Sequence, residues 1–289
     1  MISELPLVGA GGEPVDLKRT LVSHGVASLP PSSIDEEAWT LEVTLPSGRG
    51  ARTVLVSQGR SGFASVSGAT KPILEELRYM LRLDDDLSAF YAVARSEPDL
   101  AWAAAGAGRM LRSPTVFEDV VKTICTTNTA WSGTVRMVRA LVDHLGVQAR
   151  TGKRTFPTAA AMAEAGEDFY RGVARTGYRG AYLRTLADDV ASGTLDLEEL
   201  NDPELPVAEV EARLLALPGV GPYAAAHVML TSLGRYSLLV LDSWTRPTYA
   251  KLAGRKAADK TIERKFRRYG DYAGLAFWLL LTRGWVPET

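Results

Sequence analysis

The sequence predicts an α+β protein that is mostly helical and carries a small antiparallel β-domain at its N-terminus. Between positions 39 and 67, apolar and polar residues alternate as they do in half-buried strands. From residue 113 onward, apolar residues recur with helical spacing, and a glycine-rich turn at 217–221 separates two such stretches. We therefore expect a β-containing domain over residues 1–103 and a helical domain over residues 104–289.

The predicted β-domain contains a hairpin. Residues 39–45 alternate apolar and polar, residues 46–50 have the proline, serine and glycine content of a turn, and residues 52–57 fit the returning strand. Residues 63–67 fit a further strand. The first two strands together predict antiparallel pairing.

Helical spacing accounts for most of the remaining chain. Ser113 is expected to cap the third helix, with Pro114 in its first turn, where a missing N–H costs nothing. Gly146 is expected to end the fourth helix. The expected helices span about 71–83, 87–95, 113–126, 132–145, 158–165, 166–173, 178–192, 207–216, 222–230, 242–253, 256–269 and 270–282.

Composition and charge exclude several classes of protein. With 46% hydrophobic and 23% charged residues, the chain has the composition of a soluble globular protein. No apolar run approaches the roughly 20 residues that span a bilayer, and residues 1–13 do not resemble a secretory signal, so we expect a cytoplasmic protein, associated with the nucleoid in a bacterium. The single cysteine, Cys125, excludes an internal disulfide and a four-cysteine iron–sulfur cluster.

The most informative segment is Leu217–Gly221, with the sequence LPGVG, which lies between two helix-patterned stretches. Gly219 and Gly221 can adopt a positive φ and allow another backbone to come close. Pro222 suits the first turn of the second helix. The free amides at this helix start would face outward at the positive end of the helix dipole, where a phosphate binds well.

Asp242 follows this hairpin by 21 residues, at the head of another helix. The hairpin and the aspartate together resemble the helix-hairpin-helix superfamily of DNA glycosylases, which includes 3-methyladenine and 8-oxoguanine enzymes. The resemblance implies that the amides of Gly219, Val220 and Gly221 grip a DNA phosphate. It also implies that Asp242 stabilises the developing sugar cation and orients a water while the N-glycosidic bond breaks.

Tyr223 stands where the strand-cutting members of the superfamily carry a lysine, two residues past the last hairpin glycine. That lysine forms a Schiff base with the sugar, and a tyrosine cannot form this imine. The resemblance therefore implies a monofunctional glycosylase that leaves an abasic site uncut.

Two further segments resemble the 8-oxoguanine branch. Residues 124–128, ICTTN, match a segment whose final asparagine fills the gap left by the extruded base, which assigns this role to Asn128. Residues 176–182, TGYRGAY, match a motif whose tyrosine wedges beside the orphaned base and whose arginine hydrogen-bonds to it. Tyr178 and Arg179 inherit these roles, and such groups offset part of the cost of extruding a base.

The predicted base pocket departs from the 8-oxoguanine pattern. Phe277 replaces a lesion-reading glutamine and His227 replaces a reactive cysteine, while Tyr223 and Trp244 add aromatic surface. An aromatic pocket suits a positively charged alkylated purine through a cation–π contact. We therefore prefer an alkylated purine as the substrate, with 8-oxoguanine or a mismatched thymine or uracil as alternatives. Three tryptophans could line the pocket or belong to the core: Trp131, Trp244 and Trp278.

Cofactor and partner expectations follow from the same resemblance. Backbone carbonyls of Leu215, Leu217 and Val220 would hold a structural Na⁺ or K⁺, and no cofactor is required. The expected partner is duplex DNA with a damaged base, bound by a monomer and not by a membrane protein. Residues 251–268 carry a net charge of +6, which fits either phosphate contacts or a solvated helix face. Rival hypotheses are a non-catalytic damage-sensing module and a helical scaffold that binds protein.

Overall fold

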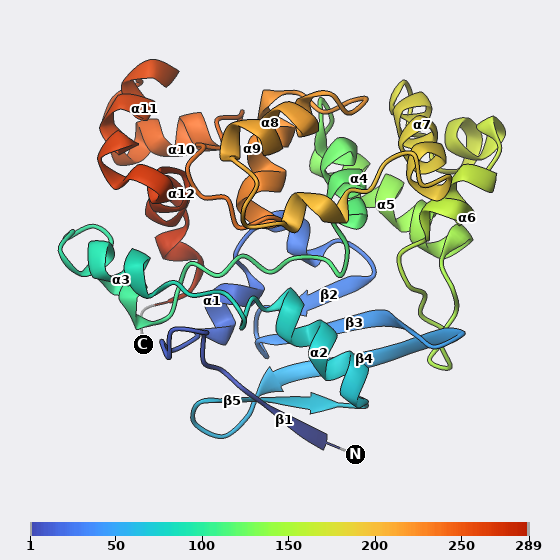
Figure 1. The fold of residues 1–289 in the computed structure, drawn as a ribbon, viewed down its shortest axis with the longest axis horizontal. Coiled ribbons are helices and arrows are strands. Elements are labelled where there is room, and N and C mark those ends of the chain that lie inside the picture. The colour runs from blue at the N-terminus through green and yellow to red at the C-terminus, as the bar shows by residue number, and fades with distance from the viewer. Residues whose placement is uncertain (1, 288–289) are drawn as a thin grey trace.

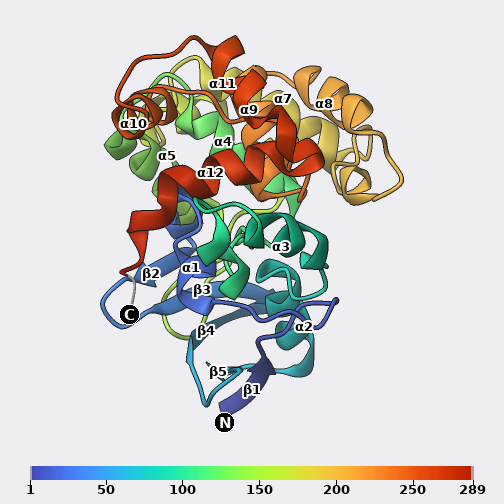
Figure 2. The same ribbon diagram turned by 90° about the vertical axis from the view of Figure 1, so that its left-hand side faces the viewer.

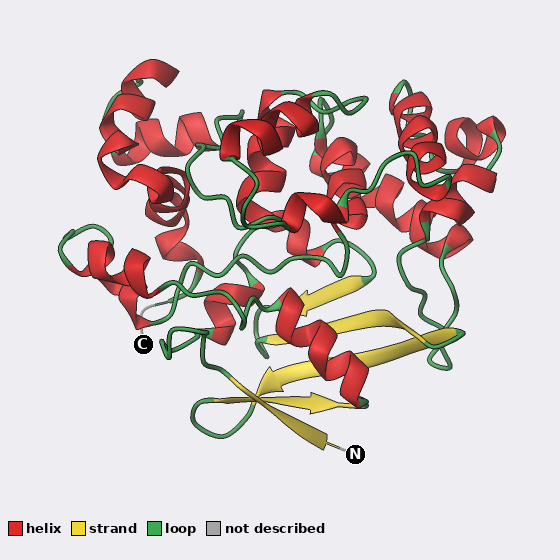
Figure 3. Cartoon of the chain, in the orientation of Figure 1, coloured by secondary structure: helices red, strands yellow, loops and turns green. Residues whose placement is uncertain are grey.

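The structure, a computed structural model, describes residues 2–287 and places a five-stranded sheet at one end and a large group of helices at the other (Figure 1, Figure 2). The colouring by secondary structure in Figure 3 shows this separation directly. The α+β class expected from the sequence is confirmed. None of the described helices has the length and hydrophobicity needed to cross a membrane.

The sheet is antiparallel throughout, with the strand order β1-β5-β4-β3-β2. The hairpin between β3 and β4 closes at the Ser47–Gly50 pair, so its turn is shorter than expected, and Gly48 has a φ of 59° there. Periodicity does not predict the edge strands β1 and β2, because short edge strands offer few alternating positions. The strands are β1 (Ile2–Pro6), β2 (Ser32–Asp35), β3 (Thr40–Ser47), β4 (Gly50–Gln58) and β5 (Phe63–Ser67).

One face of the sheet packs against α1 (Leu17–Leu21) and α2 (Lys71–Met80). Figure 1 shows α2 lying across the strands. Leu41 and Val43 from β3 and Leu77 from α2 are members of this core. Because side chains alternate along a strand, the residues between them face away from α2.

Helix α9 is the central element of the helical part. The helices are α3 (Ser88–Arg95), α4 (Val116–Thr126), α5 (Trp131–Leu145), α6 (Ala159–Glu164), α7 (Arg179–Ala191), α8 (Val207–Leu215), α9 (Pro222–Thr231), α10 (Thr245–Leu252), α11 (Asp259–Phe266) and α12 (Ala273–Thr282). Residues 224–231 of α9 are all buried, which is typical of a helix enclosed on every side. One side packs in a core with α4, α5 and α7, and another packs in a core with α3 and α12.

Short helical turns connect these elements. They are η1 (Gly25–Ser28), η2 (Ala101–Ala105), η3 (Phe169–Val173), η4 (Glu198–Asn201), η5 (Arg267–Tyr272) and η6 (Arg283–Trp285). The expected helix at 166–173 is only the single π-helical turn η3.

Two helix starts also differ from the sequence expectation. Thr115 rather than Ser113 caps α4, and its hydroxyl accepts a hydrogen bond from an amide of the first turn. Ser113 lies outside this helix because its N–H donates to a carboxylate of α4. Helix α10 begins at Thr245 rather than at Asp242. The start of α4 is therefore set by which side chain reaches the free amides.

Residues 87–107 pack with the C-terminal helices rather than with the sheet. Phe90, Tyr91 and Leu100 share a core with α9 and α12. This segment ties the N-terminal part of the chain to the helices. The domain division at residue 103 stays a prediction.

A buried ion pair joins three segments of the chain. Arg109 is fully buried, and its guanidinium donates hydrogen bonds to Glu13 and to the backbone carbonyls of Arg82 and Asp85. Glu13 Oε1 also accepts the Leu87 amide at 2.8 Å. Both charges are enclosed by protein, so removal of one would leave the other buried and unpaired.

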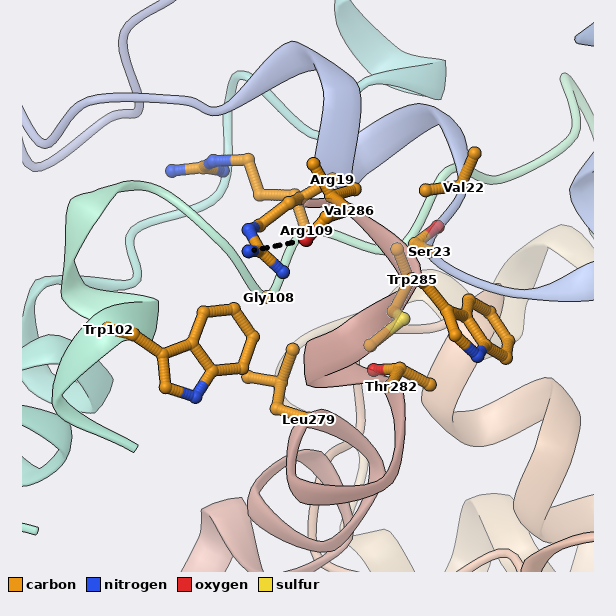
Figure 4. A pocket seen from close by; sticks show the side chains of 11 residues that line it. Arg19, Val22, Ser23, Trp102, Gly108, Arg109, Leu279, Thr282, Trp285 and Val286 are labelled. Atoms are coloured by element: carbon orange, nitrogen blue, oxygen red, sulfur yellow. Dashed lines mark hydrogen bonds between the residues drawn. The ribbon is translucent and has the colours of Figure 1, made fainter. Parts of the chain in front are cut away.

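Arg19 in α1 fastens the C-terminal segment to the N-terminal part. Its Nη1 lies 3.1 Å from the carbonyl oxygen of Arg283, its Nη2 lies 3.3 Å from that of Val286, and its guanidinium lies 4.3 Å from the ring centroid of Trp102. Figure 4 shows Arg19, Trp102 and Val286 around a cavity of about 20 Å³, which has room for a water and for no larger ligand. Trp285 also lines this cavity.

Candidate nucleic-acid interface and active site

The hairpin between α8 and α9 has the conformation that its glycines allow. Gly219 has a φ of 81°, and a Cβ there would come within 2.7 Å of the Tyr182 ring. Gly221 has open space around it, so another backbone or a phosphate could approach. The Val220 amide, in contrast to expectation, already donates to the Leu217 carbonyl at 3.2 Å. Within the described residues, the amides of Gly219 and Gly221 have no backbone acceptor, so two amides rather than three are available.

The carbonyls that the sequence assigns to a monovalent cation lie at the C-terminal end of α8. Leu215 is its last residue, and the Leu217 carbonyl accepts one hydrogen bond, which leaves it a second lone pair. The negative end of the helix dipole favours a cation there, so this donor set fits Na⁺ or K⁺. Across residues 2–287, no group of three or more His, Cys, Asp or Glu side chains is arranged to hold a metal ion.

Asp242 lies half-buried just before α10. Its Oδ1 accepts the amides of Trp244 at 2.8 Å and Thr245 at 2.6 Å, and its own amide donates to Thr245 Oγ1 at 2.8 Å. This reciprocal pairing fixes the carboxylate on the helix start. Among the described residues, Asp242 Oδ2 has no donor, so one oxygen is free for chemistry.

Tyr223 lies in the first turn of α9, and its hydroxyl is 3.2 Å from Thr126 Oγ1 at the end of α4. Burial raises the pKa of Tyr223, with a smaller contribution from the charge of Asp242. The phenol therefore stays neutral near the carboxylate. Tyr223 also lines a cavity of about 450 Å³, together with Leu241 and Arg246.

His227 lies in the core instead of lining an open pocket. It is buried beside His24, with ring centroids 5.7 Å apart in an edge-on arrangement. His24 Nε2 lies 2.7 Å from the Leu111 carbonyl oxygen. Burial lowers the pKa of His24 to about 4 and that of His227 to about 3, so both imidazoles are neutral at pH 7.

These two histidines predict a loss of stability in acid. The folded pKa of His24 is below its ordinary 6.5, so the unfolded chain takes up the proton first. Its contribution is complete above about pH 6.5 and is lost as the pH falls toward 4. Between pH 7 and pH 5, His24 should lower the free energy of unfolding by about 2 kcal/mol. Urea titrations of His24→Gln should show this fall reduced, whereas the exposed His144→Gln should match wild type. Parallel curves for His24→Gln and wild type would contradict the assignment.

Phe277 is also a core residue, in contrast to its expected place in the base pocket. It is 0% exposed and packs against Phe266 and Tyr249, with ring centroids 5.1 Å and 6.0 Å away. Its helix α12 is apolar on all sides, so a sequence alignment alone does not indicate which face meets a cavity.

Trp244 belongs to a cluster of three tryptophans next to Asp242. It is 38% exposed, and its ring lies 5.6 Å from Trp278 and 5.5 Å from Trp285. The sequence offers no periodic or motif signal for Trp285, which comes to the site from the C-terminal end through η6.

A cavity of about 290 Å³ opens beside this cluster, at the boundary between the N-terminal part and the helices. Trp285 from the C-terminal end and Gly25 and Glu36 from the N-terminal part are among the residues that line it. Trp131 lies next to Gly25, 3.6 Å from where a Cβ would be, and it begins α5 just after Asn128. The cavity thus lies between the neighbours of Asp242 and the expected gap-filling loop. It is lined by Val22, His24, Gly25, Ser28, Ile34, Glu36 and Trp285.

The expected gap residues come together beside the hairpin. Asn128 has a φ of 45°, and its Nδ2 donates to the Tyr178 hydroxyl at 3.2 Å, which lowers the pKa of Tyr178. Tyr178 is 54% exposed and its ring lies 5.9 Å from Tyr182, which packs on Gly219. Arg179, in contrast, is turned inward and is buried. Tyr178 and Asn128 are therefore the members of this group that face outward.

The basic segment 251–268 is partly neutralised by ion pairs. Arg268 donates to Glu97 at 2.8 Å. Asp259, in the same segment, accepts two hydrogen bonds from Arg246, at 2.8 Å and 2.9 Å. Arg268 is thus less available for a phosphate, whereas the Asp259 pair removes no positive charge from the segment because Arg246 lies outside it.

Comparisons with known proteins agree with this fold. No family model matches the sequence. The chain is 28% identical over 310 residues to the N-glycosylase/DNA lyase OGG1 of Arabidopsis thaliana, an alignment that covers 91% of this chain and 82% of that protein.

Three solved structures share the fold. MBOgg1 in complex with a low-affinity DNA ligand has a TM-score of 0.75 at 20% identity, covering 97% of this chain and 94% of that one. The 3-methyladenine DNA glycosylase of Archaeoglobus fulgidus has a TM-score of 0.75 at 19% identity, covering 99% and 100%. The Clostridium acetobutylicum 8-oxoguanine glycosylase/lyase, in complex with double-stranded DNA that contains cytosine opposite 8-oxoguanine, has a TM-score of 0.73 at 20% identity, covering 98% and 97%.

Proposed function

We propose that this chain is a DNA glycosylase of the helix-hairpin-helix superfamily and that it removes a damaged base from duplex DNA by hydrolysis. The observation that carries the proposal is Asp242, whose carboxylate is fixed on a helix start while one oxygen stays free. The hairpin that precedes it exposes two amides at the start of α9 for a DNA phosphate. Solved neighbours in complex with DNA support DNA as the partner.

Asp242 has two roles in the proposed reaction. As the N-glycosidic bond breaks, positive charge develops on the sugar, and the carboxylate stabilises that charge. Its free Oδ2 accepts a proton from the attacking water, so the new C–O bond forms and the base leaves with the bonding electrons. The two amides held by Oδ1 keep the carboxylate in place while the other oxygen reacts.

The proposed enzyme is monofunctional. A lyase step needs an amine that attacks the sugar, and Tyr223 occupies the position where the resemblance expects that lysine. The phenol is tied to Thr126 and kept neutral, which further disfavours a nucleophilic role. The relative named N-glycosylase/DNA lyase would differ from this chain in that respect.

The favoured substrate is a positively charged alkylated purine. The 290 Å³ cavity presents the ring of Trp285, and Glu36 is the only charged residue among its described lining. An aromatic face and a carboxylate both attract a cationic base. Since His227 and Phe277 lie in the core, this cavity replaces them as support for the preference. 8-Oxoguanine is the second candidate, favoured by the relative named OGG1.

We further propose that the hairpin carbonyls of Leu215, Leu217 and Val220 hold a Na⁺ or K⁺, which would reinforce the phosphate site. No other cofactor enters the proposed reaction. The protein is proposed to act as a monomer in the cytoplasm.

The monofunctional assignment predicts a clear product pattern. Duplexes carrying 7-methylguanine, 3-methyladenine, 8-oxoguanine, hypoxanthine, uracil or mismatched thymine would be incubated with the protein and resolved before and after alkali. We expect an alkylated purine to be released and the strand to break only after alkali, because no amine attacks the sugar. Borohydride should trap no covalent complex with wild type. Strand breakage without alkali, or a trapped complex, would show lyase activity and refute the role assigned to Tyr223.

A further inference from the structure

Arg179 directs its hydrogen-bond donors into the protein. It is the first residue of α7 and is 6% exposed. Its Nη2 donates to the Thr127 carbonyl, and its Nη1 donates to the Thr176 carbonyl at 3.3 Å. Its Nε lies 3.4 Å from Thr127 Oγ1. The face that would hydrogen-bond to a DNA base is thus occupied by backbone.

These contacts hold the residue immediately before Asn128. Thr127 is the C-cap of α4, where the chain leaves the helix. Asn128 then takes a left-handed conformation with a φ of 45°, which asparagine adopts more readily than most residues other than glycine. Arg179 holds the carbonyl on one side of this residue, and the Tyr178 hydroxyl accepts from its side chain on the other. Tyr178 and Arg179, which are consecutive in the chain, therefore both hydrogen-bond to the loop that contains Asn128.

We propose that Arg179 is a positioning residue that clamps the Asn128 loop in its gap-filling conformation, and that the enzyme consequently does not discriminate between bases opposite the lesion. The inference rests on the proposed glycosylase function. It replaces the role that the resemblance implies for Arg179, in which the guanidinium hydrogen-bonds to the orphaned base.

Release of Arg179 toward the DNA would be unfavourable. The half-buried Thr127 carbonyl would lose a charged donor, and hydrogen bonds from a charged donor are stronger than those between neutral groups. The guanidinium also lies 4.6 Å from the Tyr178 ring centroid, a cation–π contact that its release would break.

The exposed side chains of Tyr178 and Asn128 offer little by which one DNA base could be distinguished from another. Tyr178 is exposed and offers an aromatic face, on which any base can stack. Asn128 is exposed but already bonds to Tyr178. An orphaned base would therefore be supported by stacking and not identified by a pattern of donors and acceptors.

The test compares one lesion placed opposite adenine, cytosine, guanine or thymine under single-turnover conditions. For wild type we expect release rates that agree within about threefold, since no bidentate reader contacts the orphaned base. Arg179→Ala should slow all four duplexes by a similar factor, and Arg179→Lys should restore part of the rate by donating to the Thr127 carbonyl. Wild-type rates that differ by more than about 30-fold would overturn the proposal, and loss of that difference in Arg179→Ala would show that Arg179 reads the orphaned base.

A second readout needs neither DNA nor activity. Amide hydrogen exchange at residues 127–130 should become faster in Arg179→Ala while the rest of α4 is unchanged, because only the loop loses its clamp. Arg171→Ala is the matched control, since Arg171 is an exposed arginine in the preceding turn that pairs with Asp168. It should leave the exchange unchanged. Unchanged exchange in Arg179→Ala would refute the clamp, whereas failure of the wild type to release any base would refute the glycosylase function.

Discussion

Replacement of Asp242 by Asn is expected to slow base release by about a thousandfold, the largest effect of any single substitution in the proposed site. The amide oxygen of Asn can still accept the hydrogen bonds from Trp244 and Thr245, so the start of α10 should keep its geometry. What the variant loses is the negative charge beside the developing sugar cation and the oxygen that accepts the proton of water. The loss should therefore fall on the chemical step.

The measurement is single-turnover release of the preferred base, with DNA affinity and melting temperature recorded in parallel. Affinity for the duplex should persist and should weaken with salt, because phosphate contacts remain. Asp168→Asn is the matched control, as its carboxylate is almost fully exposed and lies elsewhere on the surface. It should release base at the wild-type rate. Full activity in Asp242→Asn would refute the assignment of the carboxylate. Salt-sensitive binding without any base release by wild type would instead favour a damage-sensing module.

Replacement of Glu13 by Gln should lower the free energy of unfolding by about 3–5 kcal/mol, the largest expected effect on stability. Arg109 is fully buried, and among the described residues the Glu13 carboxylate is its only charged partner. The neutral amide would leave the guanidinium charge in a low-dielectric interior without compensation. Because this pair joins residues near 13, 87 and 109, its loss should weaken the attachment of the N-terminal part to the helices.

Urea denaturation of Glu13→Gln measures this loss, and Glu4→Gln provides the control. Glu4 pairs with Arg60, and both side chains are exposed, so that substitution should cost less than about 1 kcal/mol. The double variant Glu13→Leu with Arg109→Met should recover part of the stability, because no buried charge is then left unpaired. Equal losses in Glu13→Gln and Glu4→Gln would show that burial does not strengthen the Glu13–Arg109 pair.

The helical part was the more predictable half of the fold. Helical spacing is a local property that repeats along the chain, and it placed α5, α7, α8 and α9 within one or two residues. The edge strands β1 and β2 are not predicted from the sequence, because a strand depends on the strand it pairs with as much as on its own residues. The start of α4 was misplaced for a related reason, since a carboxylate of the helix, not the expected cap, took the Ser113 amide.

For the candidate site, the sequence motifs predict roles for Asp242, the hairpin glycines, Asn128 and Tyr178, and these roles stay predictions. The structure places Asp242 at a helix start and gives Gly219 and Asn128 a positive φ, which are local backbone features that a short motif can encode. The base pocket could not be identified in this way. Trp285, which lies near the C-terminus, packs against Trp244, while Phe277 and His227 lie in the core. Which side of an apolar helix meets a cavity depends on all the elements packed around it. The inward turn of Arg179 has the same origin, since only the folded chain brings the Thr127 carbonyl within its reach.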